Sequence, residues 1–369
     1  MTDEGALIPR RNPDLLAHER AERLLLDSYN SGRLHHAWLI GGPPGIGKAT
    51  LAYRFARFVL ANGGPGEAAD GLFGAPPPPS SLRVDPEHPV ARRISASGHA
   101  DLLTIERTWD EKKKRFKRDL PVDEVRRIAP FLRLTSAEGG WRVVVVDGVD
   151  QMNPSGQNAI LKILEEPPPR ALLLLVADNV GALLPTIRSR TRRLMLDPLP
   201  EAVVVQLLAT HAPDLPAADR TALARLSEGS VGRALDLAQS GGLGLYREIL
   251  GVLEGLPRLD VLACHGLADK VARAGADQAW EAATELVLWW LARVNRGLAR
   301  GAHPPEVVAG EGVLAARLAK AAAARDRGLD RWVEVWDNVT RLFARAESAN
   351  LDRKQTMLSA LLAIEAAAA

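Results

Sequence analysis

The sequence predicts an α/β domain with a parallel sheet, followed by a small helical domain and an all-helical domain. Two observations support this fold class. Apolar runs without polar alternation, such as RVVVVD at 142–147 and ALLLLVA at 171–177, alternate with helical segments, which is typical of parallel strands buried on both faces. After Pro198 the pattern is helical throughout. We therefore expect domains at 1–197, 198–242 and 243–369.

The expected elements follow one another in a regular order. Leucines at helical spacing predict an opening helix over 13–31, whereas the Gly-, Pro- and Ser-rich stretch 62–98 indicates a long loop or insertion rather than core. Pro121 opens a helix that Pro130 should kink or split. The other expected strands are 37–41, 101–106, 142–147, 171–177 and 191–196, and the other expected helices are 47–61, 154–166, 182–190, three within 200–240, and 277–300.

Composition excludes several classes of protein. The chain has 369 residues, of which 47% are apolar and 25% are charged, with a formal net charge of +2. The apolar runs are far shorter than the ~20 residues of a membrane span and no secretory signal opens the sequence, so we expect a cytoplasmic protein without a membrane partner. Cys264 is the single cysteine, and 62–98 contains none, so we expect no disulfide, no zinc and no other metal site.

A phosphate-binding loop is predicted between the first strand and the helix after it. GGPPGIGKAT at 41–50 matches G-x-x-x-x-G-K, in which glycines let backbone N–H groups turn toward a phosphate and the lysine reaches the terminal phosphates of ATP. A glycine-rich turn with a solvated lysine is the alternative. The expected binding residues are Gly42, Pro43, Pro44, Gly45, Ile46, Gly47, Lys48, Ala49 and Thr50.

The groups that would hydrolyse a nucleotide are missing. Ala49 stands where a hydroxyl should hold Mg²⁺, and Thr50 lies about 100° further around the helix. Asp147 ends its strand as a Walker B carboxylate does, although it could instead cap the next turn, and Gly148 replaces the glutamate that activates water. General-base catalysis is worth ~10²–10⁴ in rate. We therefore expect that ATP can bind here but that intrinsic ATPase activity is inefficient.

An arginine pair lies at the end of the expected helix 182–190. Arg188 and Arg190 flank Ser189, and a surface arginine at this place could reach the phosphates of a neighbouring subunit. An arginine finger supplied in this way is worth ~10³–10⁵ in rate to the partner. A solvated arginine cluster is the alternative.

These segments together resemble the clamp-loader branch of the AAA+ ATPases. The matching segments are GGPPGIGKAT (41–50), LPVDEVRRI (120–128), VVVVDGVDQMN (143–153), QNAILKILEEPP (157–168), LLPTIRSR (183–190) and GSVGRAL (229–235). The resemblance implies an AAA+ P-loop domain with a helical lid and a helical collar. It further implies a stator subunit of the replicative clamp loader, a complex that places a ring-shaped clamp on DNA during DNA replication.

The resemblance also implies roles for two arginines and a set of partners. Arg190 corresponds to the arginine of the family's SRC motif, which serves the ATP site of an adjacent gamma subunit, although Thr191 replaces the cysteine. Arg233 corresponds to the sensor-2 arginine, which faces the chain's own nucleotide site. The sensor-1 region 177–179 lacks a threonine. The implied partners are the gamma or tau and delta subunits, the beta sliding clamp and primer-template DNA.

Three other functions are open at this point. An active AAA+ motor of the gamma or tau type would need the groups missing at Ala49 and Gly148. A stand-alone DNA-binding module would need more positive charge than the chain carries. A P-loop kinase would need a second-substrate site, which nothing in the sequence resembles.

Other residues have two interpretations each. The basic run 112–118 is expected to be a solvated hairpin tip, with a DNA contact as the alternative. Trp289 and Trp290 are expected to pack between helices rather than stack on bases. Trp332 and Trp336 suit either helix packing or a subunit contact, and Glu165 is expected to cap a helix or pair with an arginine.

Overall fold

The computed structural model describes residues 8–63, 77–107, 109–110, 115–116, 120–138, 140–324 and 328–369. Its internal contacts divide the chain into two compact units. The first runs up to Val203 and includes Gly229–Gly232, and the second comprises Val204–Glu228 and Arg233–Ala369. The predicted boundary at 242, between lid and collar, stays a prediction.

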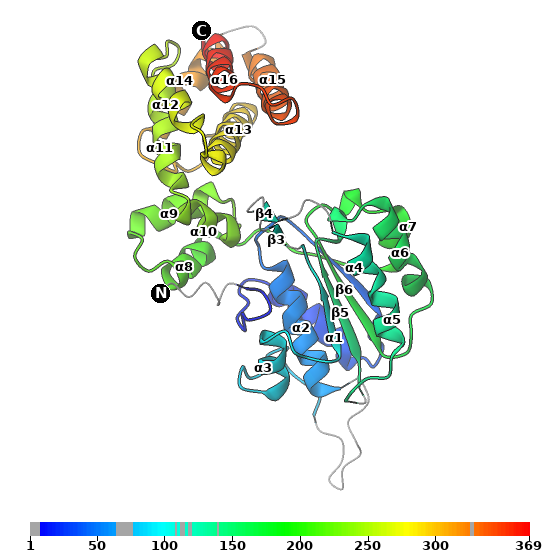
Figure 1. Ribbon diagram of the computed structural model, residues 1–369. Helices are drawn as coiled ribbons and strands as arrows, with labels where there is room; N and C mark the ends of the chain where they lie inside the picture. Colours follow the sequence, from blue (N-terminus) through cyan, green and yellow to red (C-terminus); the bar gives the residue numbers. More distant parts are fainter. Residues whose placement is uncertain are drawn as a thin grey trace. The chain divides into compact units, whose positions relative to one another are not determined.

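The first unit is built on a five-stranded sheet with the order β2-β5-β6-β1-β7 (Figure 1). Every pairing in it is parallel, as the apolar runs predict. Its strands are β1 (Ala37–Gly41), β2 (Leu102–Ile105), β5 (Arg142–Asp147), β6 (Ala171–Ala177) and β7 (Arg192–Met195). Because β1 lies between β6 and β7, the loop that follows β1 is flanked by the carboxyl ends of two other strands.

Successive residues of the inner strands pack into two separate cores. In β5, Val143 and Val145 belong to one hydrophobic cluster, while Val144 and Val146 belong to the other. All four are fully buried, which explains why this strand has no polar alternation.

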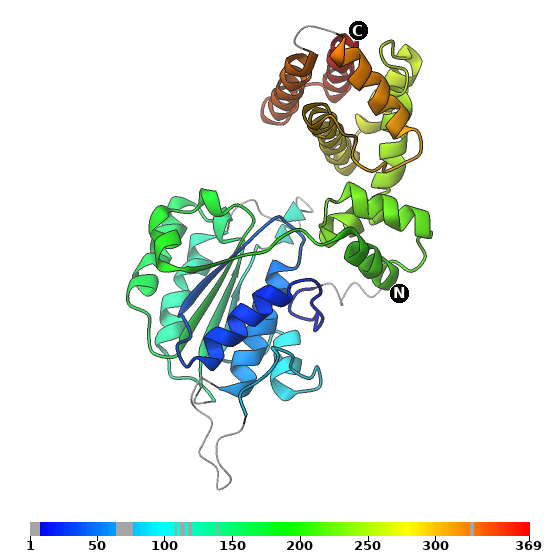
Figure 2. The same ribbon diagram turned by 180° about the vertical axis from the view of Figure 1, so that it is seen from behind.

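Helices cover both faces of this sheet. Figures 1 and 2 show α1 (Glu19–Asn30), α2 (Lys48–Asn62) and α3 (Pro89–Ser95) on one face. The other face carries α4 (Val122–Arg126), α5 (Ile128–Arg133), α6 (Pro154–Glu165) and α7 (Pro185–Arg190). The break between α4 and α5 confirms the predicted effect of Pro130, which has no N–H to donate to the carbonyl of Arg126. Short 3₁₀ turns, η1 (Val149–Gln151) and η2 (Val180–Ala182), follow β5 and β6.

Two expectations for this unit are wrong. The opening helix begins at Glu19 rather than near residue 13, because Ala17 adopts a left-handed conformation with φ 61° and the preceding segment is not helical. The stretch 62–98 contributes to the core, since Leu82, Val90 and Ile94 are buried in the cluster that covers α2. The high Gly, Pro and Ser content of 62–98 as a whole leads to the expectation of a loop, although this stretch includes the apolar residues of α3.

The basic run lies mostly outside the described residues. Two-residue strands, β3 (Trp109–Asp110) before the run and β4 (Arg115–Phe116) within it, pair antiparallel. The expectations of a hairpin tip or a DNA contact at 112–118 concern side chains outside the described part.

The described residues of the second unit form helices and the connections between them, with no strands. It holds most of α8 (Glu201–His211) and α10 (Val231–Gln239). It also holds α9 (Ala217–Leu226), α11 (Gly242–Leu253), α12 (Val261–Val271), α13 (Asp277–Arg300), α14 (Glu311–Ala323), α15 (Gly328–Ser348) and α16 (Arg353–Ala368). None of the helices within the described ranges has the length and apolar character that crossing a membrane requires.

Tryptophans form the interior of this helical unit. Trp289 and Trp290 are 6% and 2% exposed, which confirms that both pack inside despite being adjacent on α13. The Trp290 ring meets the Trp332 ring edge to face, with centroids 6.2 Å apart. Trp336, one turn after Trp332, is 40% exposed. Of the two, Trp332 therefore serves helix packing.

Candidate functional site

The phosphate loop begins where β1 ends. Gly41 pairs with Ala177 of β6 and with Met195 of β7, so the loop starts at the carboxyl edge of the sheet. Asp147 of β5 pairs with Val176, one residue before Ala177. The parallel register therefore brings the residues after Gly41, the Walker B aspartate and the residues after Ala177 to one edge, where ligands of α/β sheets bind.

The loop has the glycine conformations of a phosphate cradle. Gly42, Gly45 and Gly47 have φ values of 146°, 71° and 99°, which other residues rarely adopt. The loop leads directly into α2, whose first N–H groups have no intrahelical acceptors. The backbone therefore fits a phosphate group.

The segment 229–232 lies against this loop within the first unit. The N–H of Gly232 donates to the carbonyl of Gly45 at 3.0 Å. A Cβ at Gly45 would lie 2.4 Å from Ser230 Oγ, and one at Gly232 would lie 3.0 Å from the Gly45 Cα. Two of the motifs used in the sequence analysis, GGPPGIGKAT and GSVGRAL, are therefore in backbone contact, and glycine is required on both sides.

The lysine of the loop is held by protein groups. Lys48 Nζ forms an ion pair with Asp178 Oδ1 at 2.7 Å and donates to the carbonyl of Pro43. The Lys48 side chain is 4% exposed, while that of Asp178 is 42% exposed. The sequence analysis placed Asp178 near the sensor-1 position but did not pair it with Lys48. No local sequence signal indicates this pair, because it depends on the register of Gly41 with Ala177.

A second feature that sequence reasoning missed is the segment before α1. His18 is buried, and its Nε2 donates to the carbonyl of Ile46 at 2.7 Å. Arg54 and Arg57 of α2 donate to the carbonyls of Pro13 and Asn12, each at 2.6 Å. The non-helical segment 12–18 is thus fastened along the phosphate loop and α2.

Asp147 is the most perturbed carboxylate of the site. Burial raises its pKa to about 6, and the negative charges of Glu106 and Asp178 act in the same direction. The positive charges of Lys48 and Arg107 oppose this rise only partly. Desolvation and like charges therefore favour the protonated form of the Asp147 carboxyl group more than in water.

The positions for a metal ligand and a general base lack suitable groups. Ala49 has no hydroxyl, and Thr50 is buried, only 8% exposed. Gly148 adopts φ 84° and ψ 44°, a left-handed conformation that disfavours the glutamate of hydrolysing relatives. Asp150 accepts a hydrogen bond from the N–H of Asn179 at 2.8 Å, so its carboxylate is engaged by the loop after β6. The site fits phosphate but not Mg²⁺ coordination.

Arg190 lies at the last residue of α7, on the surface of the first unit. Its guanidinium pairs with Glu165 Oε1 at 2.8 Å and donates to the carbonyl of Thr186 at 3.2 Å. This confirms the expectation that Glu165 pairs with an arginine. The side chains are 35% and 50% exposed, and an ion pair so open to water is worth only about 0–1 kcal/mol. Arg190 can therefore exchange Glu165 for another anion at little cost.

Arg233 belongs to the second unit. It pairs there with Glu285 of α13 at 3.0 Å, and its side chain is 23% exposed. Its predicted role as a sensor-2 residue stays a prediction.

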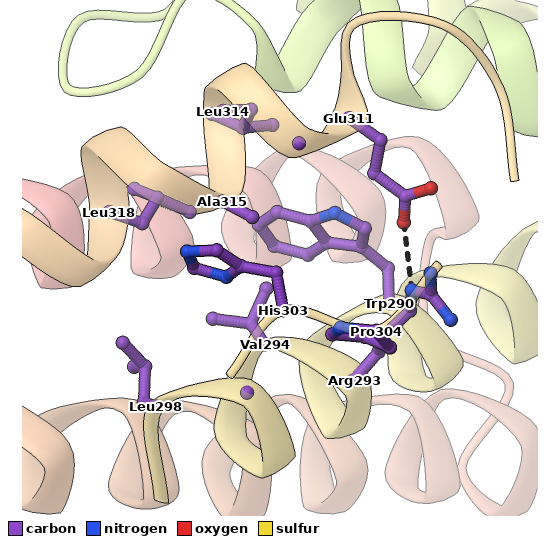
Figure 3. A pocket seen from close by; sticks show the side chains of 12 residues that line it. Trp290, Arg293, Val294, Leu298, His303, Pro304, Glu311, Leu314, Ala315 and Leu318 are labelled. Carbon is purple, nitrogen blue, oxygen red and sulfur yellow. Dashed lines mark hydrogen bonds and ion pairs between the residues drawn. The ribbon is translucent and has the colours of Figure 1, made fainter. Parts of the chain in front are cut away.

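A cavity in the second unit is too small for a nucleotide. It is lined by α13, α14 and the connection between them, including Trp290, Val294, His303 and Leu314 (Figure 3). Its volume is about 30 Å³, which is enough for one or two water molecules. The phosphate loop is the candidate site because of its glycine conformations and its lysine.

The sheet order, the phosphate loop with its Walker B strand and the arginine at the end of α7 together define a P-loop module of the AAA+ class. The family described as "DNA polymerase III, delta subunit" matches residues 17–200. A DNA polymerase III subunit delta' of Pseudomonas aeruginosa is 32% identical over 267 residues, which is 72% of each chain. The chain therefore belongs to the delta-prime family of DNA polymerase III clamp-loader subunits.

Two further relatives allow the match to delta' and the match to gamma/tau to be compared. A subunit delta' of Escherichia coli is 33% identical over 215 residues, 58% of each chain. A subunit gamma/tau of Mycobacterium tuberculosis is 27% identical over 201 residues, which cover 54% of this chain and 31% of the relative. The match to the gamma/tau subunit is thus weaker in both identity and extent.

Proposed function

We propose that this subunit acts as a stator of the clamp loader and completes the ATP site of a neighbouring motor subunit with Arg190. The observation that supports this is the combination of an exposed arginine at the end of α7 with a phosphate loop that lacks catalytic groups. Arg190 is held by a weak ion pair, so a phosphate of the neighbour competes for it effectively.

The subunit does not itself hydrolyse ATP efficiently under this proposal. Three features of one site favour it: Ala49 in place of a hydroxyl, Gly148 in a conformation unsuited to glutamate, and Lys48 engaged by Asp178. Nucleotide that binds to this loop would serve structure rather than turnover. The same features argue against a motor of the gamma or tau type.

The partners follow from the family. We infer that the subunit assembles with gamma or tau and delta subunits in the cytoplasm, and that it reaches the beta clamp and primer-template DNA through that complex. Arg233 is assigned to the sensor-2 position of the subunit's own nucleotide site by the same inference.

The test is substitution of the arginine in a reconstituted complex. Arg190→Ala should lower the thermal unfolding midpoint of the subunit by no more than about 4 °C, because its exposed ion pair is worth about 0–1 kcal/mol. DNA-stimulated ATPase and clamp loading of the complex should fall, since an arginine finger is worth ~10³–10⁵ in rate at the site it serves. Arg193→Ala, at an exposed position of β7, is the matched control and should change neither. Unchanged clamp loading by the Arg190 variant would refute the proposal.

A further inference from the structure

The strongest unassigned feature is the carboxylate that occupies the lysine of the phosphate loop. Asp178 is the first residue after β6, and Ala177 before it pairs with Gly41, the last residue of β1. Asp178 Oδ1 lies 2.7 Å from Lys48 Nζ. In P-loop proteins this lysine reaches the β- and γ-phosphates of the nucleotide. The Asp178 carboxylate thus lies where the lysine would meet a terminal phosphate.

Neighbouring hydrogen bonds fix the loop that carries Asp178. Asp150 accepts from the N–H of Asn179 at 2.8 Å, which links the loop after β6 to η1. The Asn179 side chain accepts from the N–H of Gly181 at 3.0 Å and begins η2. These bonds fix the backbone that carries Asp178, and the ion pair with Lys48 orients its side chain.

We propose that Asp178 substitutes for the terminal phosphate and makes this loop a site for nucleoside diphosphates rather than triphosphates. The inference rests on the proposed function in one respect, namely that the loop binds without hydrolysing. Beyond that function, the inference identifies nucleoside diphosphates as the ligands of the loop and Asp178 as the residue that determines this preference.

Electrostatic repulsion explains why the loop would prefer a nucleoside diphosphate to a triphosphate. A triphosphate would bring its terminal phosphate next to the Asp178 carboxylate and close to that of Asp147, whose pKa is raised by burial and, to a smaller extent, by the negative charges of Glu106 and Asp178. Ala49 supplies no ligand for the Mg²⁺ that would neutralise this charge. A diphosphate avoids the conflict, because its terminal phosphate would lie at the N–H groups of the loop and the start of α2, beside Lys48, without extending to Asp178.

The experiment titrates the full-length protein with fluorescent ADP and ATP analogues, with Mg²⁺ and with EDTA. The unmodified protein should bind the ADP analogue at least about tenfold more tightly than the ATP analogue. Asp178→Asn keeps the side-chain shape and removes the charge, so affinity for the ATP analogue should rise about tenfold while that for the ADP analogue changes within about threefold. Lys48→Met is the control and should weaken binding of both analogues.

Several outcomes overturn the inference. One is a preference of the unmodified protein for the ATP analogue, and another is an ADP-to-ATP ratio that Asp178→Asn leaves unchanged. Absence of binding by the unmodified protein and by a folded Asp178→Asn variant, as judged by thermal unfolding, also overturns it. Because these titrations use the isolated subunit, they are independent of the clamp-loading test of Arg190, and either proposal can fail without the other.

Discussion

Gly148 offers a way to test why this P-loop lacks a general base. In the folded chain it has φ 84° and ψ 44°, and a Cβ at this position would lie 2.8 Å from Gln151 Oε1. The Gln151 side chain can move aside, so the cost of a substitution is mainly that of the left-handed backbone. That cost is about 1–2 kcal/mol for residues other than glycine.

Gly148→Glu should therefore destabilise the protein without creating an ATPase. We expect unfolding to occur about 2–8 °C lower, since 1 kcal/mol shifts the midpoint of a domain of this size by about 2–4 °C. Gly148→Ala carries the same backbone strain without a carboxylate, so its midpoint should be lowered similarly. Differential scanning calorimetry measures the unfolding midpoint, and a phosphate-release assay measures the ATPase activity.

The opposite result is a Gly148→Glu variant that gains ATPase activity while its unfolding midpoint stays unchanged. A correctly placed base is worth ~10²–10⁴ in rate. ATP turnover that rises by about a hundredfold in Gly148→Glu and not in Gly148→Ala, with an unchanged unfolding midpoint, would mean that the loop after β5 adopts another conformation and that a catalytic carboxylate fits there.

Two further predictions concern buried carboxylates. Asp147 has a folded pKa of about 6, above the ordinary value of 3.8, so the folded state binds its proton more tightly and stability should decrease as pH rises from about 4 to 6. Asp147→Asn should remove this decrease and raise stability at neutral pH by on the order of 1–3 kcal/mol, whereas an unaltered pH profile in urea unfolding would contradict the assignment. Glu311 accepts hydrogen bonds from Tyr246 Oη at 2.8 Å, Arg293 Nε at 3.0 Å and the N–H of Val307 at 2.7 Å (Figure 3 draws the arginine contact). Glu311→Ala should lower the free energy of unfolding, measured by chemical denaturation, by about 3–5 kcal/mol because it leaves the Arg293 charge unpaired. Glu311→Gln should lower it clearly less. Equal losses for both variants would argue against a role for the charge of Glu311.

Much of the first unit could be predicted because its signals are local. The unbroken valines of 142–147 could only belong to a strand buried on both faces, and Pro130 marked the break between α4 and α5. The phosphate loop and its missing groups were likewise visible residue by residue.

The contacts that decide the chemistry are not local. Lys48 and Asp178 are far apart in sequence, and their pairing depends on the register of β1 with β6. The contact of Gly45 with Gly232 joins a loop to a segment beyond α9, which no periodicity indicates. Leu15 has helical spacing with later leucines, yet it lies in a non-helical segment where its Cδ1 would be 3.2 Å from a Cβ at Gly47. Spacing alone cannot distinguish an apolar residue on a helix face from one in a non-helical segment that packs against a loop.

The most direct test of the whole account is ATP turnover by the purified subunit alone, measured at saturating ATP with Mg²⁺ and primed DNA. The missing metal ligand and base predict a rate indistinguishable from that of a Lys48→Met variant. Sustained turnover on the order of 1 s⁻¹ or faster, abolished in the lysine variant, would contradict it, since that is the rate of a working nucleotide-hydrolysing or nucleotide-transferring enzyme.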